Sequence, residues 1–361
     1  MRLLSSVLAI VLFAVFPQAV IGGIRPSFTG DSEAWRSTEI VVVSTLPNEG
    51  TFVVDEVWKG DLRPGARLAV PVLIPSDDAV SLSFYMNFSQ NLSGVWTNAD
   101  RGSIAEKIPR EPVGSQMILF LESKPSNSQE PRWEPGNWMG SMKASVVWIE
   151  GDQLWSFVQV INAGPAILQR TGTLQNLKER VTKVLKTQKE IQSVLSVQDP
   201  VQRAQLLKLY LKSDVSDARK LALEELGKSG PAAVPIIRQI LDDSSYAEEA
   251  PGLIEAVVKA GGPAEGADLN ERFKREVAFW ESTGPSLQQG WWNGADAPLR
   301  LHYSQTYQLI IGLQKTLNVD ALASVKQLDD LWVSHPQLND SSGLNQISFE
   351  CERLMRMMQP D

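Results

Sequence analysis

The residues on which many catalytic and metal sites depend are scarce in this sequence. Its 361 residues include one cysteine and two histidines. A single cysteine, Cys351, excludes an internal disulfide and every site that needs paired thiols. Two histidines, His302 and His335, leave almost no material for a histidine-based metal site or a catalytic triad. We therefore predict no metal ion, no cofactor and no catalytic residue.

Common catalytic motifs are missing as well. The chain contains no HExxH, no GxSxG, no CxxC and no phosphate-binding glycine loop. We interpret His302 as a helix-face residue and His335 as a residue at a helix end, because neither has clustered partners in the sequence. Cys351 falls on the apolar stripe of SFECERLMRM and is interpreted as a small core residue.

The sequence also lacks an excess of positive charge. The formal net charge is -8, which argues against a nucleic-acid partner. One local group of cations is interpreted as the solvated face of a helix: Lys178, Arg180, Lys183, Lys186 and Lys189. A hydrophobic content of 43% is enough for a sizeable core. The length leaves room for about two domains and a targeting segment.

Residues 1–22 have the features of a signal peptide. Arg2 supplies a positive charge, an apolar core runs from Leu3 to Phe16, and a proline with small residues follows. Cleavage after Gly22, or after Ala19, would give an exported chain without a membrane span. The alternative is an uncut anchor, since Leu3 to Ile24 carries no charge and could span a bilayer.

The cysteine content narrows the compartment of an exported chain. Secreted eukaryotic domains usually carry several disulfides, whereas in a bacterial envelope disulfides are optional. With Cys351 alone, the chain fits the second setting. We therefore expect a bacterial periplasmic or extracellular location.

Residues 24–170 carry the pattern of a small antiparallel β-barrel with long insertions. Short apolar or alternating runs predict strands at 39–46, 51–58, 66–74, 116–123 and 144–160. The last of these runs turns at Glu150-Gly151-Asp152, which predicts a hairpin. Insertions at 81–114 and 124–141 are rich in polar and small residues, yet they hold several tryptophans, including Trp133 and Trp138.

Residues 171–361 are predicted to be helical. A helix over 171–197, with Thr173 as its N-cap, would link the barrel to a helical domain over 198–361. Within that domain, residues 214–243 read as two amphipathic helices separated by Gly230 and Pro231, which suit a helix end and a helix start. Further pairs are expected at 247–260 with 269–280 and at 299–317 with 319–332, before a closing helix at 347–358.

The segment 214–243 resembles a HEAT repeat in its Gly-Pro-Ala turn and in Arg219 near the start of its inner helix. The resemblance implies an α-solenoid, in which helix pairs bury their apolar faces against their neighbours. It also implies a scaffold that binds other macromolecules and rarely carries chemistry.

The first half has a less specific resemblance. A strand followed by FVVDEVWKGDLRPGARLAVPV and MILFLES is similar to the oligonucleotide/oligosaccharide-binding (OB) barrels of the netrin and tissue-inhibitor-of-metalloproteinase family. The resemblance implies an OB-like barrel over roughly residues 38–122. That family's inhibitors use an N-terminal cysteine and disulfides, which this chain lacks, so their inhibitory function is not implied.

Tryptophans are the candidate binding residues. Trp291 and Trp292 lie side by side in a loop bounded by Gly290 and Gly294, and one of them could be an exposed anchor for a partner. The alternative is that both pack between helix pairs. The same choice applies to Trp133 and Trp138, which could also stack on sugar rings.

We expect a non-catalytic binding or scaffold protein of the bacterial envelope whose partner is another protein. The alternative is a carbohydrate-binding protein or a hydrolase, with a polysaccharide as its partner. Such an enzyme would use the loop tryptophans and nearby carboxylates: Glu130, Glu134, Glu150 and Asp152.

Overall fold

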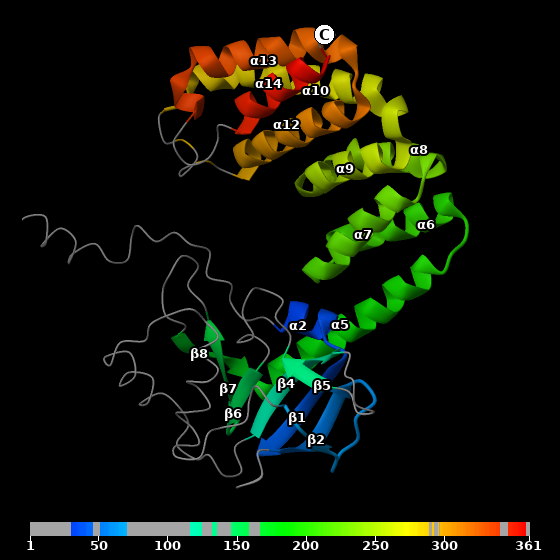
Figure 1. Ribbon diagram of the computed structural model, residues 1–361, viewed down its shortest axis with the longest axis vertical. Coiled ribbons are helices and arrows are strands. Elements are labelled where there is room, and N and C mark those ends of the chain that lie inside the picture. Colours follow the sequence, from blue (N-terminus) through cyan, green and yellow to red (C-terminus); the bar gives the residue numbers. More distant parts are fainter. Residues whose placement is uncertain are drawn as a thin grey trace, which may run out of the picture. The chain divides into compact units, whose positions relative to one another are not determined.

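The computed structural model describes residues 30–45, 51–70, 116–124, 132–135, 146–158, 167–288, 291, 295, 297–339 and 346–358. The chain divides into two units, Met1–Lys186 and Thr187–Asp361. An antiparallel half-barrel sheet forms the first unit and a set of helices the second (Figure 1). At this level the predicted order, β then α, is confirmed. The predicted signal peptide and the 81–114 insertion lie outside the described residues.

The eight described strands form one antiparallel sheet in the order β3-β2-β1-β4-β6-β7-β8, with β5 paired to β4. Their bounds are β1 (Glu39–Thr45), β2 (Phe52–Lys59), β3 (Arg67–Leu68), β4 (Gln116–Lys124), β5 (Arg132–Pro135), β6 (Val146–Glu150), β7 (Gln153–Val158) and β8 (Ile167–Thr173). One edge of β4 pairs with β6 through its first residues and with β5 through its last ones.

The β6–β7 hairpin confirms the predicted turn. Glu150 pairs with Gln153, and Gly151 takes a φ of 62° between them. Strand β5 lies inside the predicted 124–141 insertion, and β8 runs from the end of the predicted barrel domain into residues 171–173, which were assigned to the linking helix. Neither strand was predicted, because polar side chains such as those of RWEP and LQRTGT give no apolar alternation.

The centre of the sheet is buried on both faces. Val41 and Val43 of β1 share one core with Met117 and Leu119 of β4, while Ile118 points to the other face and is equally buried. Continuous apolar runs such as VVV and MILFL are what a strand covered on both sides requires.

Helices α2 (Asp31–Arg36) and α5 (Leu174–Leu195) belong to the first unit, α5 through its first half. Thr173 caps α5 as predicted, since its hydroxyl accepts a hydrogen bond of 3.3 Å from the amide of Asn176. Arg180 of α5 forms a two-pronged ion pair with Asp31 of α2, at 3.1 and 2.6 Å. The two helices are thereby joined although they are far apart in sequence.

The turn after β2 contacts α2 through Lys59 and β1 at Gly60. Lys59 Nζ donates hydrogen bonds to the carbonyl oxygens of Ala34, at 2.9 Å, and Trp35, at 3.3 Å, at the end of α2. The buried carboxylate of Glu39 accepts from the amide of Asp61 at 2.8 Å. Gly60 has a φ of 101°, and a Cβ there would collide with that carboxylate, so only glycine fits.

The second unit contains the described helices that follow α5. Its α-helices are α6 (Pro200–Leu207), α7 (Ser216–Lys228), α8 (Val234–Leu241), α9 (Ala250–Gly261), α10 (Gly266–Thr283), α12 (Ala297–Thr316), α13 (Leu322–Ser334) and α14 (Gln346–Met358). Short 3-10 helices connect them: η3 (Lys208–Lys212), η4 (Pro231–Ala233), η5 (Ser244–Glu249), η6 (Gly262–Glu265), η7 (Gly284–Ser286), η8 (Val319–Ala321) and η9 (Pro336–Asn339).

These helices pack in two layers. In the first layer α7 packs on α9, α9 on α12 and α12 on α14. The second layer holds α6, α8, α10 and α13, and its members α8, α10 and α13 each pack on the first-layer helix that follows them in the chain. The predicted helix pairs therefore correspond to α7/α8, α9/α10 and α12/α13, with α14 as the predicted closing helix.

One turn design joins the two helices of each pair. After α7, Gly230 takes a φ of 76°, and after α9, Gly262 takes a φ of 63°. Each is followed by Pro-Ala in a 3-10 helix. After α12 the same place is held by Leu317, with a φ of 48°, and Asn318 caps the following turn. The sequence revealed only the first of these turns clearly, because the third lacks glycine and proline.

The core of the second unit gathers around α9 and three tryptophans. Helix α9 is buried on nearly all sides, as its run of Leu253, Ile254, Ala256, Val257 and Val258 implies. Trp280 of α10 packs edge-on against Trp332 of α13, with ring centroids 5.1 Å apart. Within the described residues, no helix is long and apolar enough to cross a membrane.

Lys59 makes the stability of the first unit depend on pH. Burial lowers the pKa of its amine from 10.5 to about 8. Between these values the unfolded chain keeps the proton that the folded chain has lost, so the free energy of unfolding rises with pH. We expect this rise to be about 1 kcal/mol in wild type, a value reduced to allow for solvent screening of the partly exposed amine. Lys59→Met removes the titrating group and should not show the rise.

The measurement is urea unfolding of wild type and Lys59→Met at several pH values from about 7 to about 10.5. The difference between the two proteins should shift in favour of wild type as pH rises. A constant difference, or a shift the other way, would contradict the buried position of the amine.

Candidate binding surface

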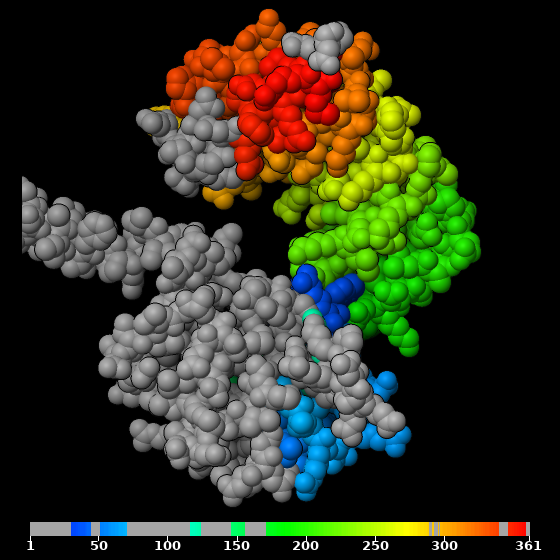
Figure 2. All heavy atoms as spheres, viewed as in Figure 1, coloured from blue at the N-terminus to red at the C-terminus, as the bar shows by residue number. Residues whose placement is uncertain are grey.

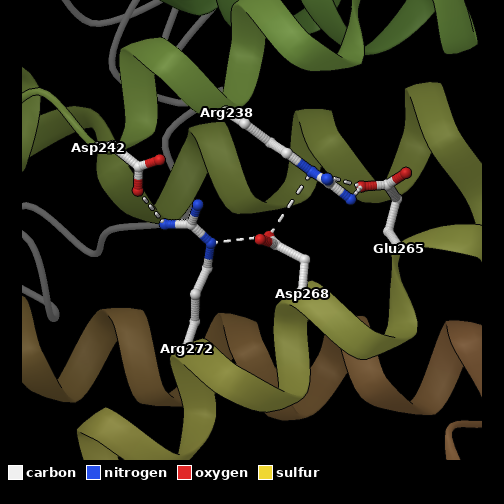
Figure 3. A network of polar contacts seen from close by, with 5 residues as sticks. All are labelled: Arg238, Asp242, Glu265, Asp268 and Arg272. Carbon is white, nitrogen blue, oxygen red and sulfur yellow. Dashed lines mark hydrogen bonds and ion pairs between the residues drawn. The ribbon is translucent and has the colours of Figure 1, made fainter.

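A continuous chain of ion pairs links α8, η6 and α10 on the second layer (Figure 3). Arg272 donates from Nη1 to Asp242 Oδ1 and from Nε to Asp268 Oδ2, both at 2.8 Å. Arg238 Nε lies 3.7 Å from the same Asp268 oxygen and donates to Glu265 Oε2 at 3.0 Å. We call these five residues the charge lattice. Asp268 is its central member because it serves both arginines.

Burial of the lattice differs from one end to the other. The side chains of Glu265 and Arg272 are 7% and 12% exposed, whereas that of Asp242 is 57% exposed. Burial alone would lower the pKa of Arg272, but its hydrogen bonds to Asp242 and Asp268 raise the pKa above its ordinary value. Paired and hydrogen-bonded charges of this kind are costly to break, since each leaves a buried charge without its partner.

The exposed side of the lattice borders a groove of about 650 Å³ between η3 and α8. Its lining residues are Lys208, Pro235, Arg238, Gln239, Asp242 and Asp243, and all but the proline have polar or charged ends on aliphatic stems. Lys208 Nζ lies 3.7 Å from Asp243 Oδ2. The groove therefore has charges of both signs that are held in place by one another, and by the lattice behind them.

Tyr246 adds an aromatic ring near this groove. Lys212 Nζ lies 4.4 Å from the ring centroid and Lys208 Nζ lies 5.1 Å from it. Cations over an aromatic face are attracted to the ring. Tyr246 thus holds two lysines of η3 beside the groove.

A second groove of about 400 Å³ lies between α10 and α13. Its lining is Glu281, Ala323, Lys326, Gln327, Asp330, Leu331 and Ser334, again with both signs of charge. Gln327 spans it by donating to Glu281 of α10. The second layer thus presents two polar grooves, one between η3 and α8 and one between α10 and α13.

Trp291, a candidate anchor, is a core residue. Its side chain is 7% exposed and its ring lies 5.9 Å from that of Trp280. This position fits the packing alternative and leaves little surface for a partner. Trp292 and Trp138 lie outside the described residues. Trp133 pairs with Ser123 through the β4–β5 ladder, and its side chain is also outside the described set.

The carboxylates of the enzymatic alternative are engaged locally where the structure describes them. Glu150 accepts a hydrogen bond of 2.9 Å from Trp155 Nε1, and Asp152 accepts one of 2.6 Å from Gln153 Nε2. Both therefore serve the hairpin in which they lie. Glu134 is in β5 opposite Glu122, and Glu130 falls outside the described residues.

The two histidines and the cysteine are held by packing and local polar contacts. His302 Nδ1 lies 2.9 Å from Glu276 Oε2, and its ring stacks on Phe279. His335 follows α13, where Nδ1 lies 3.1 Å from the carbonyl oxygen of Leu331. Cys351 is fully buried, and burial raises the pKa of its thiol well above the ordinary range. A thiol of this kind is a poor nucleophile.

Lys178 and Arg180, from the group that we interpreted as a solvated helix face, have carboxylate partners. Lys178 pairs with Glu56 and Arg180 with Asp31. In the part of the chain that the structure describes, no group of three or more histidine, cysteine, aspartate or glutamate side chains could hold a metal ion.

Comparisons of the chain with protein-family models, with curated proteins and with solved structures found no match.

Sequence reasoning missed the charge lattice. Asp242 and Arg272 are separated by 30 residues, and Arg238 and Glu265 by 27. Each of these ion pairs therefore joins a residue of the α7/α8 helix pair to a residue of the α9/α10 helix pair. Opposite charges at similar separations, on helices of neighbouring helix pairs, are the signal that could have indicated them. Only the Asp268–Arg272 pair, four residues apart on one helix, has a local signature.

Removing the charge of Asp268 should destabilise the second unit. Asp268→Asn keeps the shape but takes a charged acceptor from both arginines, so we expect the free energy of unfolding to fall by about 1–3 kcal/mol. Urea unfolding followed by far-UV circular dichroism measures this, at low and at high salt.

Glu224→Gln is the matched control, because it removes a carboxylate from an exposed pair with Lys228. We expect about 0–0.5 kcal/mol for the control, and salt should abolish its effect but not that of Asp268→Asn. Equal effects of the two substitutions would mean that the lattice does not hold the helices together.

Proposed function

We propose that this protein is a non-catalytic, exported binding or scaffold protein of the bacterial envelope that binds another protein through its helical unit. The observation that carries the proposal is the second layer, where one groove, between η3 and α8, borders the charge lattice and another lies between α10 and α13. Open grooves of about 650 and 400 Å³ are large enough to accept side chains of a bound protein.

The charges of the first groove favour recognition over chemistry. Arg238 and Asp242 are engaged in the lattice, and Lys208 faces Asp243 and Tyr246. Side chains that are fixed before a partner arrives lose little entropy on binding. Charges of both signs also select a partner by complementarity more than by bulk attraction.

We propose in addition that the helical unit is a HEAT-like α-solenoid and that the sheet belongs to an OB-like barrel. The recurring turn at Gly230, Gly262 and Leu317, together with the two-layer packing, supports a HEAT-like α-solenoid. The antiparallel half-barrel sheet supports an OB-like barrel. Export rests on the signal-like residues 1–22 and on the single cysteine.

The proposal is tested by site-specific photo-crosslinking in cells that express the full chain. A photoreactive phenylalanine derivative replaces Gln239 in the first groove, and Lys259 on α9 serves as the control position. We expect one defined protein adduct at Gln239, recovered with the periplasmic fraction, and none at Lys259.

Several outcomes would overturn the proposal. They are equal adducts at both positions, no protein adduct at Gln239, or recovery in the cytosol. Turnover of a polysaccharide that is lost in Glu134→Gln would support the carbohydrate-active alternative instead.

A further inference from the structure

Helix α14 is the last described member of the first layer. Each earlier member of that layer is covered by the next, α7 by α9, α9 by α12 and α12 by α14. Part of α14 (red) faces the surface in Figure 2. Among the described residues, five of the six exposed large hydrophobic side chains follow α12: Leu317, Val319, Val333, Phe349 and Met357.

The two sides of α14 differ in what they contact. One side is buried in the core of the second unit: Ile347, Glu350, Cys351, Leu354 and Met358. The other side carries Phe349, which is 57% exposed, Met357, which is 47% exposed, and two arginines, Arg353 and Arg356. We call these last four residues the α14 stripe. A helix that ended a stack against water would normally be polar on this side.

Polar contacts on the buried side fix the orientation of α14. Gln314 of α12 donates to Glu350 Oε2 at 2.7 Å and to the Glu350 carbonyl oxygen at 3.1 Å. On the α13 side, Ser348 donates to Asp329 at 2.6 Å. With both neighbours bound to it, α14 cannot rotate to bury Phe349 without breaking these bonds.

The stripe carries two arginines, with the exposed carboxylate of Glu352 beside them, although the chain as a whole has a net charge of -8. Arg353 lies 3.5 Å from Glu350, and Arg356 lies 3.9 Å from Glu352. These are surface pairs within one helix, which contribute little and are exchanged easily. Both guanidinium groups are more than half exposed and have N–H donors to offer a second carboxylate.

We propose that the α14 stripe is the docking site for an acidic amphipathic helix of a partner protein, which packs on α14 as the next helix of the first layer. Phe349 and Met357 are its apolar anchors, and Arg353 and Arg356 pair with carboxylates beside the partner's apolar face. The inference rests on the proposed scaffold role and adds a surface separate from the grooves.

The test uses the full chain and two designed helical peptides of about 20 residues with the same apolar positions. One peptide carries glutamates beside those positions and the other carries lysines. Fluorescence anisotropy measures their binding to wild type, to Phe349→Ser/Met357→Ser and to Arg353→Glu/Arg356→Glu. Leu209→Ser is the matched control, because Leu209 is an apolar residue outside the stripe that is 70% exposed.

We expect wild type and Leu209→Ser to bind the acidic peptide about tenfold or more tightly than the basic one. Removing the anchors should weaken binding of the acidic peptide about tenfold. Arg353→Glu/Arg356→Glu should reverse the preference, while thermal melting of all variants remains that of wild type. The reversal is a result that loss of folding could not produce.

The inference is overturned by equal binding of both peptides, by a loss as large in Leu209→Ser, or by no binding to wild type. Binding of anionic phosphatidylglycerol vesicles, with the same dependence on Phe349 and Arg356 and without peptide preference, would assign the stripe to a membrane surface instead. If the Gln239 crosslink is found and the peptides fail, the scaffold role stands and only this inference falls.

Discussion

The helical unit depends on one constraint, which is that no helix in it can bury its apolar side chains alone. Helix α9 shows this most clearly, because Leu253, Val257 and their neighbours are buried against α7, α8 and α12. An isolated helix as short as α9 is marginal in water. Each fully buried Leu, Ile or Val adds about 1.5–3 kcal/mol of transfer free energy. The packing of α9 is therefore what makes its own helix, and the helices on it, stable.

Around this apolar centre, polar groups decide which helices pair and at which position. The charge lattice joins α8 to α10 through Asp268, and the Gln314–Glu350 contact joins α12 to α14. Partly buried charges with matched partners tolerate few alternative arrangements, because a shifted helix would leave some of them unpaired. In the first unit the Glu39 carboxylate under Gly60 plays a comparable part, since it ties the β2 turn to β1.

What could be predicted from the sequence was local. The Gly151 turn, the Thr173 cap and the turn at Gly230 each follow from residues a few positions apart. What could not be predicted depends on partners distant in sequence. The sequence leaves Trp291 open between an exposed anchor and a packing residue, and only the position of Trp280 beside it favours packing. The lattice residues look like ordinary surface charges until consecutive helix pairs are stacked. Phe349 differs in the opposite direction: it is an aromatic residue of an amphipathic helix, yet it is exposed, because the other side of α14 fills the core.

The central claim, that the helical unit is organised around α9, is tested most directly by native-state hydrogen exchange on the full chain. Global unfolding is needed to expose the amides of a helix enclosed by its neighbours, whereas α6 at the start of the unit can open locally. We predict that the amides of Leu253 to Ala260 exchange more slowly than those of any other helix in the unit. Exchange in α9 as fast as in α6 would contradict the account.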